Sequence, residues 1–432
     1  MNSNTMSKEA SPYFQSYRSL FIILLLINLI IESAARIFNL PFGPYETILS
    51  SNPNDSTVEL SWLALFAVHA VIACDPDRRA VIWLGFSLEI ARFVWLMPTL
   101  DRANILMATP GMGLGFAAVA VSAWRAVMLP AGAHRREAID ILCGLLFGVF
   151  GGSLFAFFHW VVMNICVLVY DHRIYAFDVA LGLNPSPDAH HSLLRLLPLY
   201  SLCAFCYMAI PLAIGLAAGV EISHRDDRWL SIIPACVLAA CVGFLLYFIA
   251  PAIGPRMAFL ADYPDHMPTS AALGTELFAS NVGNGVRNAM PSLHATWALL
   301  VLASTWRGRT WIKGVAVIYV ALVLLATLGL GEHYLADLVP AAPLALLTIG
   351  LGARLPLGER LFKAILPGAA LIAAWILPFR FGWEWWAPYP LVLTWAGVVT
   401  VPGLAWLSYR RLYGAPHDDE SVMFGAPAGA RP

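Results

Sequence analysis

Two histidines stand in sequence contexts that suit catalysis. His294 follows Pro291 and Ser292, and His333 is followed four residues later by Asp337. On a helix this i, i+4 spacing places an imidazole and a carboxylate on one face, within hydrogen-bonding reach. A carboxylate in that position would orient the imidazole and stabilise its positive charge after a nucleophilic attack. The spacing therefore predicts His333 as a nucleophile, Asp337 as the group that orients it, and His294 as the acid–base group.

The residues before His294 predict an anion site. Pro291 suits the first turn of a helix, where its missing N–H needs no partner. The free N–H groups of such a turn, together with the positive end of the helix dipole, attract anions. Ser292 could add a hydroxyl donor. The alternative for a single histidine is packing at the membrane interface, but two histidines in these contexts favour chemistry.

The composition shows where such a site would lie. The chain is 59% hydrophobic and 12% charged, whereas soluble domains carry about a quarter charged residues. We therefore expect an all-α polytopic integral membrane protein. The net charge of −1 and the lack of a long basic run give no indication of nucleic-acid binding. The expected partners are the lipid bilayer and a membrane lipid substrate, and the sequence does not indicate an oligomeric state.

The hydropathy pattern predicts about twelve transmembrane helices, because a bilayer core needs about 20 apolar residues per helix. The apolar runs lie near 19–36, 58–74, 80–98, 105–130, 139–170, 193–220, 230–250, 290–306, 311–330, 336–353, 362–379 and 388–409.

The charges predict the orientation, because cytoplasmic loops hold the excess of Lys and Arg. With the N-terminus inside, eighteen of the 26 cations fall on the cytoplasmic side and seven on the other, with Arg92 inside a span. Both termini are then cytoplasmic. One cytoplasmic loop, 307–313, separates the two histidine motifs, so both return to the extracytoplasmic face. Three lysines against twenty-three arginines, with short loops, favour a bacterial inner (cytoplasmic) membrane.

The histidine motifs carry a family resemblance. Residues 291–294 resemble the PSxH motif of the type 2 phosphatidic acid phosphatase superfamily, and residues 333–337 resemble its HxxxD motif. Tyr247 and the stretch 251–256 resemble the first motif of the branch that contains inositol phosphorylceramide synthases (inositolphosphotransferases). Asp171 and Asp178, before Leu181-Gly182, resemble an aspartate-containing outer segment of that branch.

The resemblance covers about 139–353 and implies a six-helix catalytic core there. The stretch 1–138 would be an N-terminal four-helix membrane region, and 354–432 would hold two C-terminal membrane helices and a cytoplasmic tail. The implied enzyme is a metal-independent lipid phosphatase or phosphotransferase without a cofactor.

By the same resemblance, His333 would attack phosphorus to form a phosphohistidine, while His294 would protonate the leaving oxygen and later deprotonate the acceptor. Arg256 and Ser292 would bind the phosphate oxygens of the substrate. Further residues are candidates for lining the substrate cleft: Asp171, Asp178, Tyr247 and Tyr334.

Two positions depart from the family pattern. Ile249 stands where the first motif usually has a lysine, and Thr327 stands where the third motif usually has an arginine. Arg287, close to the PSxH residues, is a candidate replacement for the missing phosphate-binding cations. The alternative is that Arg287 is a solvated charge at the rim of the site.

The sequence leaves the reaction open. Hydrolysis and transfer share the same first half-reaction, and the acceptor decides between a phosphatase and a headgroup transferase of the inositol phosphorylceramide synthase type. A metal-dependent phosphotransferase would show a dense aspartate cluster on a helix, and none is present. A third alternative is a non-catalytic lipid-binding or transport protein, although the paired inverted repeats of transporters are not visible.

Overall fold

Helices dominate the computed structural model. It describes residues 12–40, 43–44, 63–69, 75–96, 112–182, 184–224, 232–269, 278–279, 287–306, 308–353, 356–382 and 390–413. Within these residues the strands are two short antiparallel segments, β1 (Leu168–Val169) and β2 (Phe278–Ala279). The all-α fold class is therefore confirmed.

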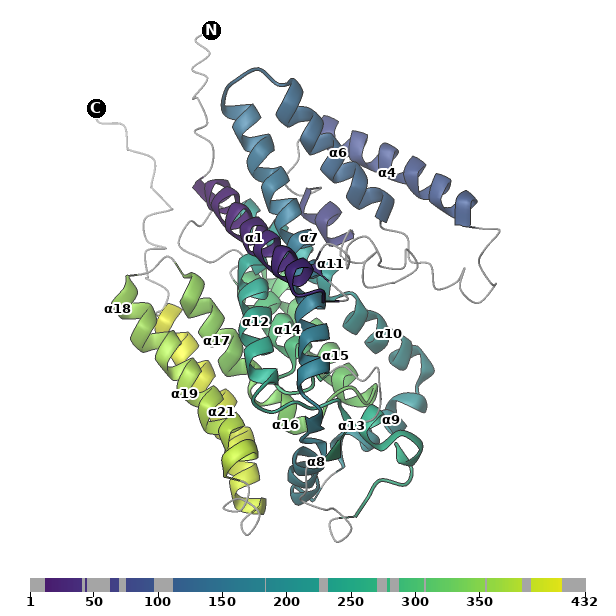
Figure 1. Cartoon of the computed structure of the whole chain (residues 1–432), viewed down its shortest axis with the longest axis vertical. Coiled ribbons are helices and arrows are strands. Elements are labelled where there is room, and N and C mark those ends of the chain that lie inside the picture. Colours follow the sequence, from purple (N-terminus) through teal and green to yellow (C-terminus); the bar gives the residue numbers. More distant parts are fainter. Residues whose placement is uncertain are drawn as a thin grey trace, which may run out of the picture.

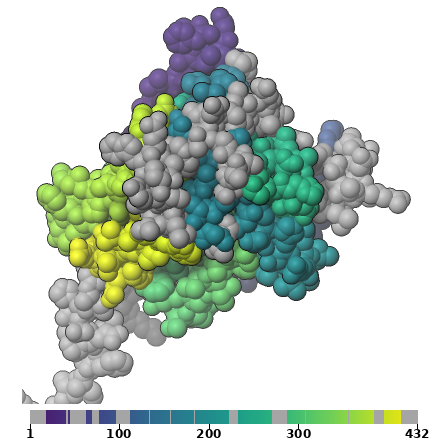
Figure 2. All heavy atoms as spheres, turned by 90° about the horizontal axis from the view of Figure 1, so that it is seen from below, coloured from purple at the N-terminus to yellow at the C-terminus, as the bar shows by residue number. Residues whose placement is uncertain are grey.

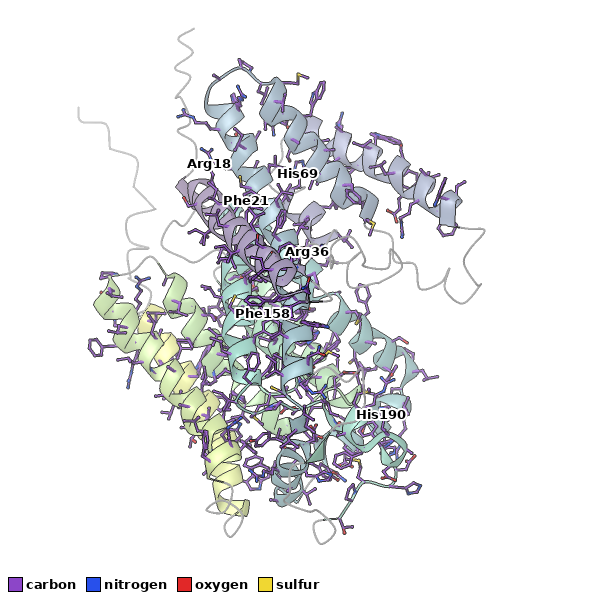
Figure 3. All side chains as sticks on the ribbon, in the orientation of Figure 1. Arg18, Phe21, Arg36, His69, Phe158 and His190 are labelled. Atoms are coloured by element: carbon purple, nitrogen blue, oxygen red, sulfur yellow. The ribbon has the colours of Figure 1, made fainter. Side chains whose placement is uncertain are left out.

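The N-terminal helices form a layer of their own. They are α1 (Pro12–Ile37), α4 (Asp75–Leu96), α6 (Met112–Met128) and the 33-residue α7 (Ala133–Ile165). Helix α1 packs along α7, and α4 and α6 form a pair that projects away from the rest of the molecule (Figure 1). Figure 3 shows Phe21 on the α1 side of this layer, where its ring lies 5.7 Å from that of Phe150 on α7. Helix α7 thereby links the layer to the core.

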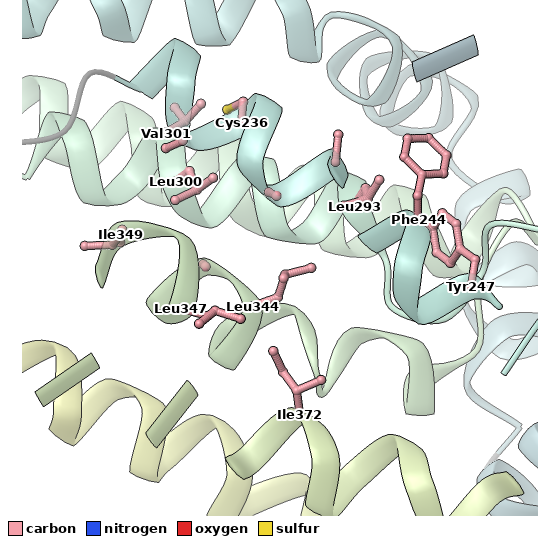
Figure 4. Packing of buried hydrophobic residues seen from close by; sticks show 14 of the residues in the cluster. Cys236, Phe244, Tyr247, Leu293, Leu300, Val301, Leu344, Leu347, Ile349 and Ile372 are labelled. Atoms are coloured by element: carbon pink, nitrogen blue, oxygen red, sulfur yellow. The ribbon is translucent and has the colours of Figure 1, made fainter. Parts of the chain in front are cut away.

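The core surrounds helix α14 (Leu293–Thr305), which packs against α11 (Ile210–His224), α12 (Ile232–Tyr247), α15 (Thr310–Gly329) and α17 (Ala341–Gly352). Helices α12, α14 and α17 are apolar along their length, and their facing side chains are buried together (Figure 4). Because lipid is as apolar as these side chains, close van der Waals packing, and not removal of apolar surface from water, fixes the ends of these helices relative to one another.

Short elements gather at one end of the core. They are α8 (Asp171–Ala180), α9 (Pro185–Leu194), α13 (Pro255–Phe259), the 3-10 turn η1 (Leu260–Asp262) and α16 (Leu335–Leu338). Figure 1 places them together at the lower end of the molecule, and Figure 2 views the molecule from that end, with the C-terminal helices in yellow along one side.

The C-terminal helices pack on the opposite side of α17 from α14. They are α18 (Leu357–Arg360), the π-helical turn η2 (Leu361–Ile365), α19 (Leu366–Phe381) and α21 (Pro390–Tyr413). Trp375 and Phe379 of α19 are buried and approach Phe177 of α8, with ring centroids 5.2 and 5.6 Å away. The C-terminal helices therefore reach the end of the core where the short elements lie.

The number of membrane spans differs from the prediction. Among the described residues, five helices are long and apolar enough to cross a bilayer, or six if one bent pair counts as a single span. These helices indicate an integral membrane protein, but the twelve-span count and the six-helix core are not confirmed. Three more apolar helices, among them α14 with 13 residues, are shorter than a usual span. Most of the predicted run 58–74 lies outside the described residues.

The predicted run 193–220 is a broken helix. It consists of α10 (Leu197–Met208) and α11, whose axes differ by 64°. Pro211 is the second residue of α11 and cannot donate a backbone hydrogen bond into the preceding turn, so a bend is expected there. The bend directs the end of α10 toward the N-terminus of α14.

Candidate active site

Three loops meet at the end of the core where the short elements lie. They are the loop before α13, the turn before α14 and the turn before α16. Backbone hydrogen bonds connect them: Ala289 N–H to Ala252 O at 3.0 Å, Arg256 N–H to Gly331 O at 2.9 Å, and Ser292 N–H to Asp337 O at 3.0 Å. The three sequence motifs are therefore joined directly through their main chains.

Glycine is required where two of these loops cross. Gly254 has φ of 86° and Gly331 has φ of 74°, a region that other residues rarely adopt. A Cβ on Gly254 would overlap the carbonyl of Glu332, the residue before His333. The first loop can therefore lie against the His333 loop only because this position carries no side chain.

His333 has the hydrogen bonds of a nucleophile. Its Nδ1 lies 2.9 Å from the carbonyl oxygen of Ala289, which can only accept, so Nδ1 carries the proton. The Nε2 atom then keeps its lone pair, and it lies 3.2 Å from the Ser292 hydroxyl, which can donate to it. The His333 side chain is 3% exposed. Burial and two fixed contacts hold this ring in one orientation.

The relation between His333 and Asp337 differs in detail from the prediction. Helix α16 begins at Leu335, with Tyr334 as its N-cap, so His333 lies before the helix and does not share a helical face with Asp337. Asp337 Oδ2 lies 3.6 Å from His333 Nδ1 and accepts the Tyr334 N–H at 2.8 Å. The Ala289 carbonyl therefore makes the shorter contact that selects the tautomer. The buried Asp337 carboxylate is still close enough to stabilise positive charge on the ring.

His294 faces His333 across the site. It is the second residue of α14, and the two ring centroids are 6.3 Å apart with an interplanar angle of 62°. The two predicted catalytic histidines are thus brought together at one end of the core. Among the described residues, no hydrogen bond to either ring nitrogen of His294 is found, so its nitrogens are available to a substrate.

Tyr207 positions His294, and the sequence analysis did not identify it. The phenol ring at the end of α10 stacks on the His294 imidazole, with centroids 3.8 Å apart and an angle of 11°. Trp297 approaches the same imidazole edge-on at 5.9 Å. The proline-associated bend after α10 directs Tyr207 here. The one available sequence signal was Pro211 within an apolar run.

Ser292 is the N-cap of α14, and its Oγ accepts the Ala295 N–H at 3.3 Å. Serine is a preferred N-cap because its oxygen replaces a missing backbone acceptor. The helix therefore begins two residues later than a first turn at Pro291 would require. Pro291 lies before the cap and not in the first turn. The positive end of the α14 dipole still falls at His294.

Asp171 and Asp178, expected as candidate cleft residues, act as anchors of the loops. The Asp171 carboxylate accepts the N–H groups of Ile253 and Gly254. The Asp178 carboxylate accepts the N–H groups of Leu335 and Ala336 at 2.7 and 3.0 Å, and so caps α16. Both aspartates are buried, and burial raises the pKa of Asp171 to about 7 and that of Asp178 to about 8.

The two tyrosines expected in the cleft have different surroundings. Tyr334 is fully buried, and its hydroxyl donates to Asp171 Oδ1 at 2.9 Å. Tyr247 is buried at the end of α12, and its ring lies 5.6 Å from Phe244 and 6.5 Å from His159. Tyr334 therefore belongs to the anchoring network, whereas Tyr247 belongs to an aromatic group beside the histidines.

The two arginines predicted to bind phosphate differ in exposure. The Arg256 side chain is 62% exposed, and its guanidinium lies 3.8 Å from the Glu332 carboxylate. Arg287 is buried, and its Nε donates to the carbonyl oxygen of Cys166, the C-cap of α7. A cation there stabilises the negative end of the α7 dipole. Arg256 is therefore the more accessible cation for a phosphate.

The position of the missing family arginine is part of the core. Thr327 is fully buried in α15, and its carbonyl oxygen accepts the His333 N–H at 3.1 Å. A cation could not occupy this place without being buried itself. Among the described residues, no group of three or more His, Cys, Asp or Glu side chains could hold a metal ion.

Helix α19 supports the site from outside the motifs. The buried Trp375 indole donates to the carbonyl oxygen of Ala336 in α16 at 2.9 Å. Arg380 donates to the carbonyl oxygens of Phe248 and Ile249, which follow α12. The C-terminal region therefore fixes two of the elements that carry motif residues.

One of three comparisons with known proteins found a match. No curated protein and no solved structure matches the chain. A family model matches part of the chain, and that family suggests phosphatase or phosphotransferase activity on a phosphate-containing substrate. Residues 172–351, which hold both histidine motifs and the anchor Asp178, match the family model described as PAP2 superfamily.

Proposed function

We propose that this protein is a membrane enzyme that removes or transfers a phosphoryl group of a lipid through a phosphohistidine on His333. The observation that supports this most directly is the state of the His333 ring. Its Nδ1 is occupied by a carbonyl acceptor, its Nε2 keeps a lone pair, and the His294 ring lies 6.3 Å away. This arrangement suits a nucleophile and an acid–base group on either side of one phosphorus atom.

In the first step the Nε2 lone pair of His333 forms a bond to phosphorus, and the bond to the leaving oxygen breaks. His294, protonated at the start, gives its proton to that oxygen. The positive charge that develops on the His333 ring is stabilised by Asp337, whose Oδ2 lies 3.6 Å from Nδ1. In the second step an acceptor oxygen attacks phosphorus and gives its proton to His294, and the nitrogen–phosphorus bond breaks.

The negative charge on phosphorus needs support from the chain. The N-terminus of α14, capped by Ser292, supplies the positive end of a helix dipole. Arg256, whose side chain is exposed, supplies a cation. A guanidinium that pairs with a phosphate exchanges its weak contact with Glu332 for two strong hydrogen bonds.

The setting of the site supports a lipid substrate. The histidines lie at the ends of apolar helices, where a headgroup at the membrane surface would meet them. Cations gather at the opposite ends of the core helices, for example Arg309 and Lys313 at the start of α15. Because cytoplasmic segments hold the excess of Lys and Arg, we propose that the site lies on the extracytoplasmic face. The three lysines against twenty-three arginines and the short loops favour a bacterial inner membrane.

The acceptor is water in a phosphatase and an alcohol in a headgroup transferase. The resemblance of the first motif to that of the inositol phosphorylceramide synthases favours an alcohol such as inositol, whereas hydrolysis requires no second substrate. We propose hydrolysis of a lipid phosphate or diphosphate as the basal reaction and headgroup transfer as the alternative.

The experiment is a turnover assay on purified protein with labelled lipid phosphates, with and without inositol or lipid alcohols. Phosphate release without an acceptor supports hydrolysis, and an acceptor-dependent labelled lipid supports transfer. His333→Ala should remove either activity, whereas His191→Ala, at an exposed histidine of α9, should retain it. Equal activity in wild type and His333→Ala would overturn the proposal in favour of a non-catalytic lipid-binding protein.

A further inference from the structure

A third histidine lies beside the site and has no role in the steps above. His159 is on α7, and its Nε2 atom is buried without a hydrogen-bond partner among the described residues. A buried polar atom without a partner costs free energy that folding does not recover, so native structures contain few of them. Such an atom next to an active site suggests a partner that arrives with the substrate.

A ring contact between α7 and α14 places His159 near the depth of His294. Phe155 and Trp297 are in contact, with ring centroids 5.5 Å apart. Phe155 is four residues before His159 on α7, and Trp297 is three residues after His294 on α14. The two helices run in opposite directions, so both histidines lie on the same side of this contact, His159 about 6 Å and His294 about 4.5 Å of helix rise away from it. His159 is also close enough to His294 to interact with it electrostatically.

Aromatic rings surround His159 on the sides that the structure describes. The edge contacts are with Phe155 at 4.3 Å and Phe244 at 5.1 Å, and Tyr247 lies nearly parallel at 6.5 Å. Figure 4 shows Phe244 and Tyr247 at the end of α12, next to Leu293 at the start of α14. An aromatic environment of this kind disfavours a charged ligand group and tolerates a neutral one that accepts a hydrogen bond.

We propose that the His159 imidazole binds the lipid substrate itself, through an N–H donated by Nε2 to an ester or amide carbonyl of the linkage between the phosphate and the acyl chains. This inference rests on the proposed function and specifies its substrate class: a phosphorylated lipid with carbonyl-linked chains. His159 would select such lipids over ether-linked lipids, while His333 and His294 act on the phosphate.

The test separates binding from turnover. In the His333→Ala background, dissociation constants are measured for dioleoyl phosphatidate and for its dialkyl ether analogue, which has the same chain lengths and no carbonyl groups. With His159 present, the ester lipid should bind about five- to tenfold more tightly, the effect of one neutral hydrogen bond. In His159→Phe, which keeps a ring of similar shape, the two lipids should bind equally. His159→Gln, which retains an N–H donor, should restore part of the preference.

A control variant on the same helix and two possible results decide whether the inference holds. Asn164→Leu removes an exposed polar group from the same helix and should leave the lipid preference unchanged. Equal binding of the two lipids when His159 is present would overturn the inference, and this comparison needs no variant at His159 that could misfold. A preference that survives in His159→Phe would also overturn it. Turnover by the unmodified protein is measured separately, so a preference that depends on His159 without any turnover would refute the proposed function, and only the lipid-binding role of His159 would stand.

Discussion

Removing the Tyr334 hydroxyl is expected to weaken the fold by an amount that grows with pH. This hydroxyl donates to Asp171 Oδ1 at 2.9 Å, and Asp171 also accepts two backbone N–H groups of the loop before α13. Burial raises the pKa of Asp171 to about 7, whereas the hydrogen bond from Tyr334 acts to lower it. Tyr334→Phe keeps the buried ring and removes one donor to the carboxylate.

The sign follows from linkage between protonation and folding. The folded-state pKa of Asp171 lies above its value of 3.8 in the unfolded chain, so its contribution to stability is present below about pH 4 and is lost as the pH rises through about 7. Without the Tyr334 donor the folded pKa rises further, which extends this loss to higher pH. At about pH 5 the variant loses a hydrogen bond to a neutral acid, about 1 kcal/mol; at about pH 8.5 it loses one to a carboxylate, about 2 kcal/mol.

The assay is denaturant unfolding of purified protein in mixed micelles at both pH values. Tyr319→Phe is the matched control, because the Tyr319 hydroxyl donates to the neutral carbonyl of Cys206 at 3.1 Å. That variant should lose about 1 kcal/mol at both pH values. If the penalty of Tyr334→Phe is equal at the two pH values, or smaller at pH 8.5, then Asp171 does not need the hydroxyl as a donor to its charged form, and the anchoring argument is wrong.

Three further predictions concern the site. His294→Asn should slow leaving-group release in a single turnover by about 10²- to 10⁴-fold on a lipid phosphate and by much less on p-nitrophenyl phosphate, whose leaving group needs no proton. Equal losses in this first step would contradict the acid role. Arg256→Ala should reduce kcat/KM about tenfold or more. Because the side chain is exposed, the same variant should change the unfolding free energy by less than about 0.5 kcal/mol. An unchanged kcat/KM would exclude Arg256 from phosphate binding. Trp375→Phe should destabilise the protein by about 1–3 kcal/mol, because the buried Ala336 carbonyl loses its donor. Trp406→Phe is the control, because its ring is half-exposed, and it should change stability by less than about 0.5 kcal/mol.

The histidines could be predicted from the sequence because their signals are local. Pro-Ser before His294 and the aspartate after His333 are readable within a few residues, and the single loop predicted between two helices returns both rings to one end of the core. The finer geometry depended on contacts that no local pattern contains. The carbonyl that fixes the His333 tautomer belongs to Ala289, more than forty residues away, and any residue has a carbonyl.

Other parts of the site could not be read from the sequence for a similar reason. An aromatic residue in an apolar helix is common, so Tyr207 gave no signal until the bend after α10 brought it against His294. Asp178 looked like a cleft residue because it is polar and lies in an outer segment, but its carboxylate caps α16. Hydropathy counts apolar residues and does not register bends or short helices, which is why the predicted span count exceeds the five or six that the described residues support.

The phosphoenzyme itself provides the most direct test of the account. Purified protein is mixed with lipid phosphate labelled with ³²P, quenched within milliseconds in alkali, and digested. Phosphohistidine is stable in alkali and is lost in acid, so the account predicts an acid-labile label on the peptide that contains His333, and none in His333→Ala. A wild-type protein that turns over without any such label, or a label that persists in His333→Ala, would contradict it.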